Sequence, residues 1–437
     1  MIDKLVHRVR EELRKGIVKN ILWLYLVHIV NYLIPLITIP YLTRTLGREG
    51  WGVFAFFQSF ALYITSIVDF NFIQSGTREV SRFRDDKWKR SQIVAGVIGA
   101  KLLLSVGLLL ICIPLQQLLT SFRTNPLIFW MGIVWAISLG FSFVWYFQGM
   151  EKMKWVALLD FLAKGLATVA IFFFIHEPDD VWLVFLFYSI ANIVSMLFAA
   201  MLAYREMPFV LPTIALSWQM IRLGLTLFFS RMSINFYSTA NVFVLGLFTS
   251  PAQVGIFAGA DKLGKAFCAI TAPITYATFP RMSHTLVRNR DEGRKLIIKS
   301  SLLMFSSSAV LSLFNFVIAP YYTKYYLGAG FEEATEVLRW QSLLILTGAM
   351  SNVFAVQWLL PLGFDKMYNR ITIISAAAHI VLAAWLATRF GAVGMAWTVI
   401  LTELLVVICT LFVLSKRKLL PWNPQALHEN TNESNGR

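Results

Sequence analysis

The amino-acid sequence predicts an all-α integral membrane protein. We expect twelve transmembrane helices in two six-helix bundles around a central lumen, with both termini in the cytoplasm. Three observations predict this fold: the apolar composition, the number of long apolar stretches, and the uneven placement of lysine and arginine along the chain.

The composition calls for a bilayer. Hydrophobic residues make up 57% of the 437 residues, charged residues only 14%, and the mean hydropathy is +0.64. Soluble domains carry about 25% charged residues, so this chain has too few to cover itself with a water-compatible surface. The composition therefore excludes a soluble enzyme, a nucleic-acid-binding domain and a disulfide scaffold.

The apolar stretches give the number of spans. About 20 mainly apolar residues cross a bilayer as a helix. Stretches of this kind are predicted at residues 17–42, 51–75, 93–119, 126–149, 155–176, 181–204, 221–248, 254–280, 297–320, 334–361, 370–390 and 392–414.

The basic residues give the orientation. With the N-terminus placed inside, 28 of the 39 Lys and Arg residues fall in the terminal segments, in the inner connections or at the margins of spans beside them. Only five lie in the opposite connections: Arg44, Arg48, Arg123, Lys324 and Arg389. By the positive-inside rule, this bias predicts cytoplasmic termini. The net charge of +15 is thereby explained by orientation, and no nucleic-acid partner is expected.

The spans divide the chain into five parts. Residues 1–16 have helical apolar spacing with basic residues between, which predicts an amphipathic helix on the cytoplasmic membrane surface. Pro208 and Pro212 lie in the longest interior polar connection, near the midpoint of the chain. We therefore predict an N-terminal bundle at 17–204, a linker at 205–220, a C-terminal bundle at 221–414 and a cytoplasmic polar tail at 415–437.

The two halves contain a weak internal repeat. Gly52-Val53-Phe54-Ala55 aligns with Gly255-Ile256-Phe257-Ala258 at an offset of 203 residues, and the same offset places Arg78 on Arg281. Because six spans preserve orientation, this would be a parallel repeat about an axis along the membrane normal.

The sequence carries no pattern of catalytic or metal-binding residues. The three cysteines all fall inside apolar spans without ligand spacing, and the six histidines are scattered. His379 is expected to be a hydrogen-bonded packing residue. No outer connection assembles the paired carboxylates of a glycan-processing enzyme. We therefore expect no cofactor, no metal and no enzymatic activity.

Charged residues inside the spans are the most informative. Such residues cost about 3 kcal/mol at the centre of a span and usually face a bundle interior or a water-filled cavity. Asp160 and Lys164 lie four residues apart on one helix, as do Asp261 and Lys265, so each pair can neutralise itself. The full set is Asp69, Lys101, Asp160, Lys164, Arg231, Asp261, Lys262, Lys265, Arg339 and Glu403.

Two readings of these charges remain open. In the first, Arg231 and Lys101 pair with Asp69 or Glu403 across helices and hold the bundles together. In the second, the basic members line a cationic lumen suited to an anionic amphipathic solute. The lumen set is Arg231, Lys101, Lys262 and Lys265, together with Asn31 and Asn235 from polar stripes of the first and seventh spans.

Four segments resemble one known family. They are IPYLTRTLGREGWGVFAF at 39–56, DFNFIQSGTREVSRFRDD at 69–86, VGIFAGADKLGKAFCAITAPITYATFPRMS at 254–283, and LLPLGFDKMYNRI at 359–371 followed by FGAVGMAWTVILTELLV at 390–406. The chain resembles Wzx-type O-antigen flippases, in the polysaccharide transporter family of the multidrug/oligosaccharidyl-lipid/polysaccharide superfamily. Asn71 departs from the family pattern, which has glycine at this turn, while Glu403 matches a recurring acid.

The resemblance implies a substrate and a cycle. The substrate is an undecaprenyl-diphosphate-linked oligosaccharide repeat unit, moved by alternating access from the inner to the outer leaflet of the bacterial cytoplasmic (inner) membrane. Arg231, Lys262 and Lys101 would attract the diphosphate, and Asn31 and Asn235 would bind sugar hydroxyls. Ion coupling through Asp69 or Glu403 is equally compatible with the sequence. Polymerase and chain-length proteins of the same glycan pathway are the expected partners.

Three other classes compete with this interpretation. An ion-coupled drug or metabolite antiporter of the same superfamily would favour acids inside its spans, whereas here the cations outnumber them six to four. A glycan polymerase or ligase should carry a substantial outer loop with catalytic residues. A purely structural scaffold would gain nothing from a mid-membrane arginine such as Arg231.

Overall fold

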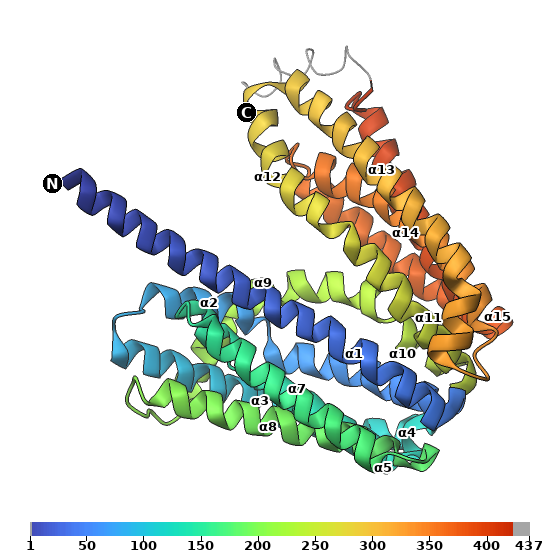
Figure 1. The fold of residues 1–437 in the computed structure, drawn as a ribbon, viewed down its shortest axis with the longest axis horizontal. Coiled ribbons are helices and arrows are strands. Elements are labelled where there is room, and N and C mark those ends of the chain that lie inside the picture. Colours follow the sequence, from blue (N-terminus) through green and yellow to red (C-terminus); the bar gives the residue numbers. More distant parts are fainter. Residues whose placement is uncertain (1, 423–437) are drawn as a thin grey trace. The chain divides into compact units, whose positions relative to one another are not determined.

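The computed structural model describes the backbone of residues 2–422. It describes side chains over the same range except at 2–33, 230–231, 233–239 and 287. Within these limits every regular element is helical and no strand occurs (Figure 1). The predicted all-α class is confirmed.

The chain forms two compact units. Unit 1 comprises Met1–Gly50 and Phe57–Met232, and unit 2 comprises Trp51–Phe56 and Ser233–Arg437. Each unit has its own buried apolar cluster, as expected for separate helical bundles.

Unit 1 takes in most of α1 (Ile2–Asp69), which packs with a series of shorter helices. Its buried cluster is centred on aromatic side chains such as Phe72, Trp145 and Tyr146. Helix α2 packs on α6, and both α5 and α7 pack on α8. The other elements are α2 (Phe72–Arg82), α3 (Lys87–Leu118), α4 (Thr120–Thr124), α5 (Pro126–Gly140), α6 (Val144–Gly149), α7 (Met153–Phe174), η1 (Pro178–Asp180), α8 (Val181–Tyr204) and most of α9 (Ile214–Thr239).

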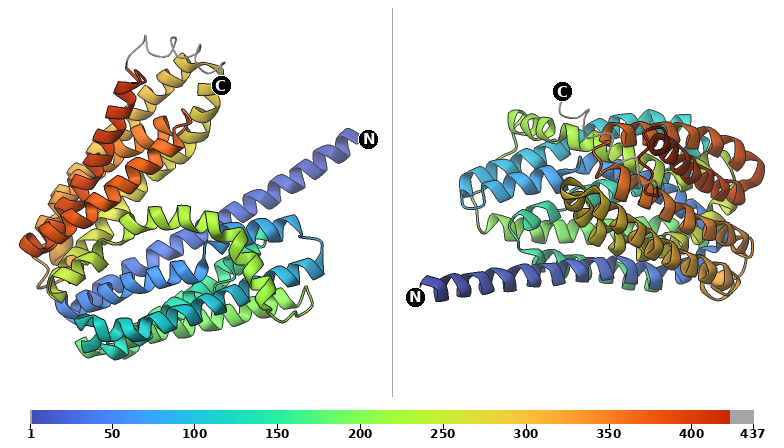
Figure 2. Two further views of the ribbon diagram at one scale, coloured as in Figure 1. Left: turned by 180° about the vertical axis from the view of Figure 1, so that it is seen from behind. Right: turned by 90° about the horizontal axis from the view of Figure 1, so that it is seen from above.

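In unit 2, which runs from yellow-green to red in Figure 2, α14 contacts α11, α13 and α15. Its core includes Met282, Val353 and Trp358, and the indole of Trp358 donates a hydrogen bond to the Leu419 carbonyl. The elements are α10 (Asn241–Phe248), α11 (Pro251–Ile270), α12 (Ala272–Arg288), α13 (Arg290–Tyr321), α14 (Ala334–Ser351), α15 (Asp365–Lys416) and two π-helical segments, η2 (Tyr322–Leu327) and η3 (Asn352–Leu359).

The two longest helices are each broken by a glycine. Gly47 in α1 has φ 65° and Gly391 in α15 has φ 55°, a left-handed conformation that glycine adopts without a Cβ penalty. Gly47 lies between the predicted spans 17–42 and 51–75, and Gly391 lies between 370–390 and 392–414. These glycines therefore end one helix and begin the next within a single hydrogen-bonded run.

Eight helical segments among the described residues are long and apolar enough to cross a membrane. Large apolar side chains on them are exposed, as lipid-facing side chains are, including Leu110, Phe173 and Leu302. The segments are Ile34–Arg82, Lys87–Leu118, Pro126–Gly149, Met153–Phe174, Pro178–Tyr204, Arg290–Leu327, Ala334–Leu359 and Asp365–Lys416. The chain is thus a multi-pass membrane protein.

The halves of the predicted repeat break at similar places, which differ by two to three residues at the 203-residue offset. Helix α1 ends at Asp69, and the 203-residue offset carries Asp69 onto Ala272, where α12 begins after the break that ends α11. In unit 2 the two aligned tetrapeptides also touch, because a Cβ on Gly52 would collide with the Pro251 carbonyl and approach the Gly255 nitrogen to 2.9 Å. This agreement favours the repeat.

The conformation of Asn71 shows why this turn does not need the glycine that the family pattern has there. It adopts φ 57° and ψ 31°, the left-handed conformation in which asparagine is the best substitute for glycine. Its side-chain amide donates hydrogen bonds to Gln74 and to the Leu227 carbonyl, both at 3.2 Å. The turn between α1 and α2 is therefore kept without glycine.

Candidate functional site

The charged residues of the spans whose side chains are described are divided between the two units. Asp69, Lys101, Asp160 and Lys164 lie in unit 1, whereas Asp261, Lys262, Lys265, Arg339 and Glu403 lie in unit 2.

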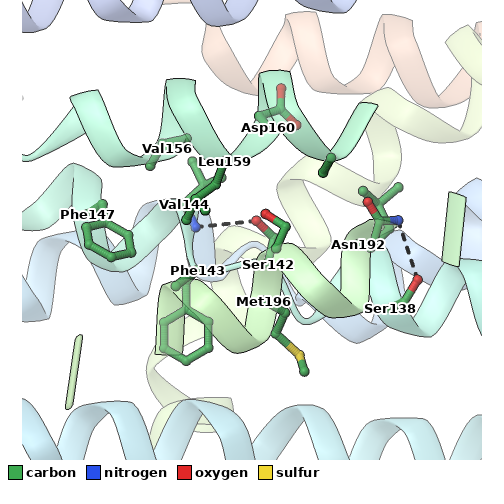
Figure 3. A pocket seen from close by; sticks show the side chains of 14 residues that line it. Ser138, Ser142, Phe143, Val144, Phe147, Val156, Leu159, Asp160, Asn192 and Met196 are labelled. Atoms are coloured by element: carbon green, nitrogen blue, oxygen red, sulfur yellow. Dashed lines mark hydrogen bonds between the residues drawn. The ribbon is translucent and has the colours of Figure 1, made fainter. Parts of the chain in front are cut away.

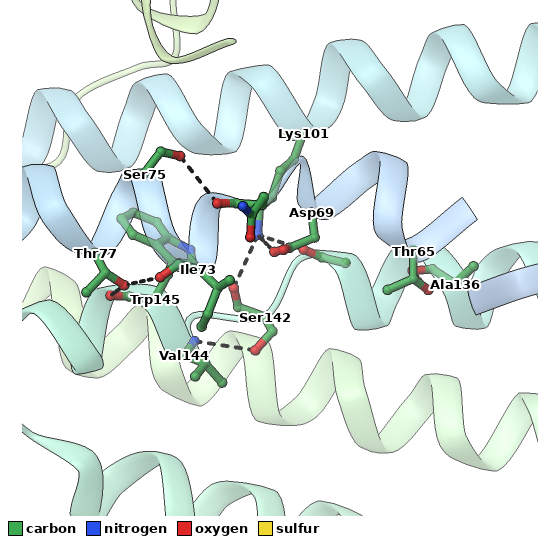
Figure 4. Close-up of polar contacts among 12 residues, drawn as sticks. Thr65, Asp69, Ile73, Ser75, Thr77, Lys101, Ala136, Ser142, Val144 and Trp145 are labelled. Atoms are coloured by element: carbon green, nitrogen blue, oxygen red, sulfur yellow. Dashed lines mark hydrogen bonds and ion pairs between the residues drawn. The ribbon is translucent and has the colours of Figure 1, made fainter. Parts of the chain in front are cut away.

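In unit 1, Lys101 joins two helix breaks (Figure 4). Its ammonium donates to the carbonyls of Gly140, at 2.6 Å, and Ser142, at 3.3 Å, and lies 3.6 Å from the Asp69 carboxylate. Gly140 ends α5 and Asp69 ends α1, so a cation placed here satisfies carbonyls that the helix end leaves open. Lys101 is fully buried.

Lys101 and Asp69 therefore form an ion pair between helices, which was the first of the two alternatives that the sequence allowed. Three acceptors surround the ammonium, and the aromatic ring of Phe72 lies 5.9 Å from it. Such a cluster holds α1, α3 and α5 together at the depth where two of them break. Lys101 is therefore held inside unit 1.

A small pocket lies beside the same α5–α6 break (Figure 3). Its volume is about 60 Å³, and its polar walls include Ser138, Ser142 and Asn192, with the Asn192 amide donating to Ser138 at 3.4 Å. Asp160 also lines it and is paired with Lys164 at 2.8 Å. The predicted neutralisation of this pair is confirmed. The pocket has room for a few water molecules but none for a sugar.

Unit 2 contains a much larger polar cavity, of about 390 Å³. It is walled by α10, α11, α12, α14, α15 and the π-helical segment η3, with Met304 contributed by α13. Asp261 and Lys265 form an ion pair of 2.7 Å on its α11 side, as their spacing predicted. Glu403 lines it from α15, and Ser351 lines it from the end of α14.

A network of neutral polar side chains adjoins this cavity. Thr275 donates to the Asn352 oxygen at 2.7 Å, and the Gln357 amide donates to the same oxygen at 3.0 Å. The Gln357 oxygen in turn accepts from Ser300 at 2.6 Å and from Thr278 at 2.8 Å. Asn352 and Gln357 both belong to η3, whose wider turn is a frequent feature of functional sites.

Sequence reasoning missed this network because it concentrated on charged groups. The available signal was an asparagine and a glutamine five residues apart inside a predicted span, opposite threonines of another span. His379 was predicted to be hydrogen-bonded, and its Nδ1 does lie 3.0 Å from the Thr402 hydroxyl. Its side chain also lines the cavity, which the sequence did not indicate.

The remaining predicted lumen residues are placed differently. Lys262 is exposed on α11 and does not line the unit 2 cavity, whereas Lys265 does. The side chains of Arg231, Asn31 and Asn235 lie outside the described residues. Among the residues that are described, no group of three or more His, Cys, Asp or Glu side chains could hold a metal ion.

Outside the spans, one ion pair ties the α6–α7 turn to the end of α2. Arg84 donates to Glu151 at 2.8 Å and to the Gly149 carbonyl at 2.9 Å. The hydrogen bond from Arg84 is the main cause that holds the pKa of Glu151 below its usual range.

Known proteins match nearly the whole chain. Residues 17–286 match the family described as "Polysaccharide biosynthesis protein". A protein of Escherichia coli (strain K12) named "Putative O-antigen transporter" is 32% identical over 92% of this chain and 97% of its own length. A protein of the same name from Shigella dysenteriae is 29% identical over 89% of this chain and 98% of its own.

Solved structures show the same fold at low identity. The lipid II flippase MurJ in an inward closed conformation superposes with a TM-score of 0.67 at 12% identity, over 90% of this chain and 87% of its own. An inward-facing multidrug resistance MATE family transporter of the MOP superfamily gives 0.62 at 14% identity, over 88% and 98%. With the sequence matches, these place the molecule among transporters. The chain belongs to the polysaccharide biosynthesis protein family, as a Wzx-type polysaccharide transporter of the multidrug/oligosaccharidyl-lipid/polysaccharide superfamily.

Proposed function

We propose that this protein is a flippase for an undecaprenyl-diphosphate-linked oligosaccharide, namely the repeat unit of an O-antigen. It moves this lipid from the inner to the outer leaflet of the bacterial inner membrane. The observation that carries the proposal is the match to two O-antigen transporter relatives over about nine-tenths of the chain. The fold shared with a lipid II flippase supports it, because lipid II is also a lipid-linked glycan.

We propose an arrangement of twelve transmembrane helices in two six-helix bundles around a central lumen, which opens alternately to the two leaflets. Both termini lie in the cytoplasm, with the 1–16 helix and the 415–437 tail, and the 205–220 linker joins the bundles. The left-handed breaks at Gly47 and Gly391 support the division of α1 and α15 into two spans each. The bias of Lys and Arg supports the orientation.

We assign the substrate contacts in the lumen from the charge and hydrogen-bonding groups of the predicted lumen residues. Arg231 and Lys262 bind the diphosphate, while Asn31 and Asn235 bind sugar hydroxyls. Lys101 and Lys265 belong to the same basic set, yet each has a carboxylate partner in the structure. Their contribution is therefore to set the potential and the helix positions near the substrate.

Two sources of energy fit an anionic substrate. One charge crossing 100 mV is worth about 2.3 kcal/mol, so a diphosphate of roughly two negative charges leaving a negative cytoplasm gains about twice that. Coupled ion movement through Asp69 or Glu403 is the other source. The exported repeat unit would then pass to polymerase and chain-length proteins of the same pathway.

Deletion of the gene in its host tests the proposal. A diphosphate-linked oligosaccharide should accumulate facing the cytoplasm while surface glycan disappears, and a plasmid copy should reverse both changes. Mass spectrometry of the trapped lipid would name the repeat unit. Normal surface glycan without trapped lipid would contradict the proposal and favour the ion-coupled antiporter, which drug and ion transport would then test.

A matched pair of substitutions tests the lumen contact. Arg231→Ala should abolish glycan display at a normal protein level, and Arg231→Lys should retain it because the charge is kept. Full display in both variants would remove Arg231 from the substrate site. Exposed Arg123→Ala, in a predicted outer connection, is the control.

A further inference from the structure

A groove with basic walls lies between α12 and α13 of unit 2, two helices that pack side by side (Figure 1). Its volume is about 550 Å³, and it shares no lining residue with the polar cavity of the same unit. The basic side chains are Arg281 and His284 from α12 and Lys295 and Lys299 from α13, and the acid is Glu292. With the histidine neutral, three cations and one carboxylate give the groove a net charge of +2.

The groove lies on the exposed side of this helical hairpin. The opposite faces of the two helices, with Met282, Leu286 and Ile297, are buried in the core of unit 2. Gly293 allows the close approach of the helices, since a Cβ there would lie 2.5 Å from Leu286 Cδ2. All four basic side chains of the groove are exposed, and none forms an ion pair or a side-chain hydrogen bond with another described residue. They are therefore available to an anion from outside the bundle.

The sequence places the groove at the depth of lipid headgroups. Arg281 directly follows the predicted span 254–280, and Lys299 lies at the start of the predicted span 297–320. Long basic side chains at such positions keep their charged ends in the polar headgroup region. In the orientation proposed above, these headgroups belong to the cytoplasmic leaflet, whose anionic lipids attract lysine and arginine.

An exposed apolar stripe continues from the groove along α13. Lys295, Lys299, Leu302, Ser306 and Val310 recur at intervals of three or four residues and so share one face of the helix. Leu302 is 72% exposed and Val310 is 68% exposed. From Lys299 to Val310 the helix rises about 16 Å, and half of the hydrocarbon core is about 15 Å thick. Cations at headgroup depth and apolar side chains through one leaflet match the form of a phospholipid, whereas a sugar would need polar contacts along the stripe.

We propose that this groove binds the headgroup of an anionic phospholipid of the cytoplasmic leaflet, such as phosphatidylglycerol. The lipid phosphate lies between Arg281, Lys295 and Lys299, and an acyl chain follows the stripe of Leu302 and Val310. Charge-assisted hydrogen bonds hold the phosphate. A zwitterionic headgroup is disfavoured because its positive group would meet the same cations. The bound lipid joins α12 to α13, and the site does not depend on which solute the protein transports.

Photochemical labelling tests the location of the site. A phosphatidylglycerol with a diazirine in one acyl chain is added in small amount to phosphatidylcholine vesicles that carry the full-length protein. After illumination, mass spectrometry of peptides should find the label concentrated in residues 298–310. A phosphatidylcholine with the same diazirine chain measures the labelling that any neighbouring lipid would give. Equal labelling of this segment by both probes would mean that the lipid there is not selected, and would overturn the proposal.

A matched pair of double variants tests the headgroup contact. Lys295→Gln with Lys299→Gln should weaken phosphatidylglycerol labelling of the segment about 25-fold, since each basic side chain near a membrane surface contributes about fivefold. Lys366→Gln with Lys416→Gln removes the same charge from exposed positions of unit 2 outside the groove, and should leave the labelling unchanged. Equal labelling in the wild type and in the groove variant would overturn the proposal.

Thermal unfolding gives a second measurement and shows whether the variants fold. In phosphatidylcholine alone, both double variants should unfold at the wild-type temperature, because the substituted side chains are exposed. Added phosphatidylglycerol should raise the apparent Tm of the wild type and of the control variant, because a ligand stabilises the state that binds it. The rise should be smaller in the groove variant. An equal rise in all three proteins would contradict the site.

Competition distinguishes the sources of phosphate. Unlabelled phosphatidylglycerol should displace the probe, whereas inorganic phosphate should not, because it has no chain to lie on the apolar stripe. Displacement by inorganic phosphate would make the groove a free-phosphate site, and displacement by undecaprenyl diphosphate but not by phosphatidylglycerol would assign it to the transported lipid. Either result would overturn the proposal. Because no transport is measured, failure here leaves the flippase function untouched.

Discussion

The polar interiors of the two units are built in opposite ways. In unit 1 the buried charges are packed against partners, with Lys101 held by Asp69 and two carbonyls beside a pocket of about 60 Å³. In unit 2 the polar groups surround a cavity of about 390 Å³, and Glu403 on its wall forms no ion pair with any residue whose side chain is described. The comparison teaches that charge inside a span can serve packing in one bundle and line a polar cavity in the other.

Removing the Lys101 ammonium should have the largest effect. Lys101→Met leaves the half-buried Asp69 without its cation and the Gly140 carbonyl without its donor, and breaking a buried pair costs up to about 3–5 kcal/mol. The apparent Tm of purified protein should fall steeply. Adding Asp69→Asn should recover part of the loss, since the uncompensated charge is gone. An unchanged Tm in Lys101→Met would show that the cluster is not structural.

Two glycine-to-alanine substitutions compare the tight packing of unit 1 with the cavity wall of unit 2. A Cβ on Gly140 in unit 1 would lie 2.6 Å from Val68 Cγ1, whereas a Cβ on Gly348, which lines the unit 2 cavity, would meet nothing within 4 Å. Gly140→Ala should destabilise the protein by about 1–3 kcal/mol. Gly348→Ala should be neutral or stabilise by up to about 1 kcal/mol through helix propensity. Thermal unfolding in detergent measures both, and equal losses would contradict the comparison.

The modification rates of two cysteines measure how accessible each unit's interior is to water. Cys112 is buried in α3 of unit 1, whereas Cys268 lines the cavity of unit 2. With Cys409→Ser in the background, a small charged thiol reagent should modify Cys268 at least about tenfold faster than Cys112, because reactivity follows access. Mass spectrometry of timed samples gives the two rates. Similar rates would mean that the cavity is no wetter than the interior of unit 1.

The Arg84–Glu151 ion pair should have the smallest effect. Both side chains are substantially exposed, so Glu151→Gln should cost less than about 1 kcal/mol. Because the pKa of Glu151 is lowered in the folded protein, its contribution is present above the ordinary glutamate pKa and fades as the pH falls through the folded value. The Tm difference between wild type and variant should shrink with acidification; a growing difference would contradict this.

The sequence predicted the helical membrane fold because apolar length and charge bias are local properties. The i, i+4 pairs Asp160–Lys164 and Asp261–Lys265 were predicted for the same reason, and both form. The surroundings of Lys101 could not be chosen in advance, because its partners come from the ends of two other helices. The unit 2 cavity depends on the π-helical turn at Asn352 and on which face His379 presents, and no spacing rule gives either.

The glycines include positions whose role could be predicted from the sequence and one whose role could not. Gly47 and Gly391 fall where the predicted spans end, since a left-handed residue is the simplest way to stop a helix. Gly140 has ordinary helical geometry, and only its contact with Val68 shows why a larger residue would not fit.

The most direct test of the account is leaflet transfer by the purified protein. A fluorescent undecaprenyl-diphosphate oligosaccharide is confined to the inner leaflet of vesicles at zero gradient, and an external quencher reports its arrival outside. We predict rapid loss of fluorescence in vesicles carrying wild-type protein and a much slower loss with Arg231→Ala. Transfer no faster than in protein-free vesicles would contradict the account.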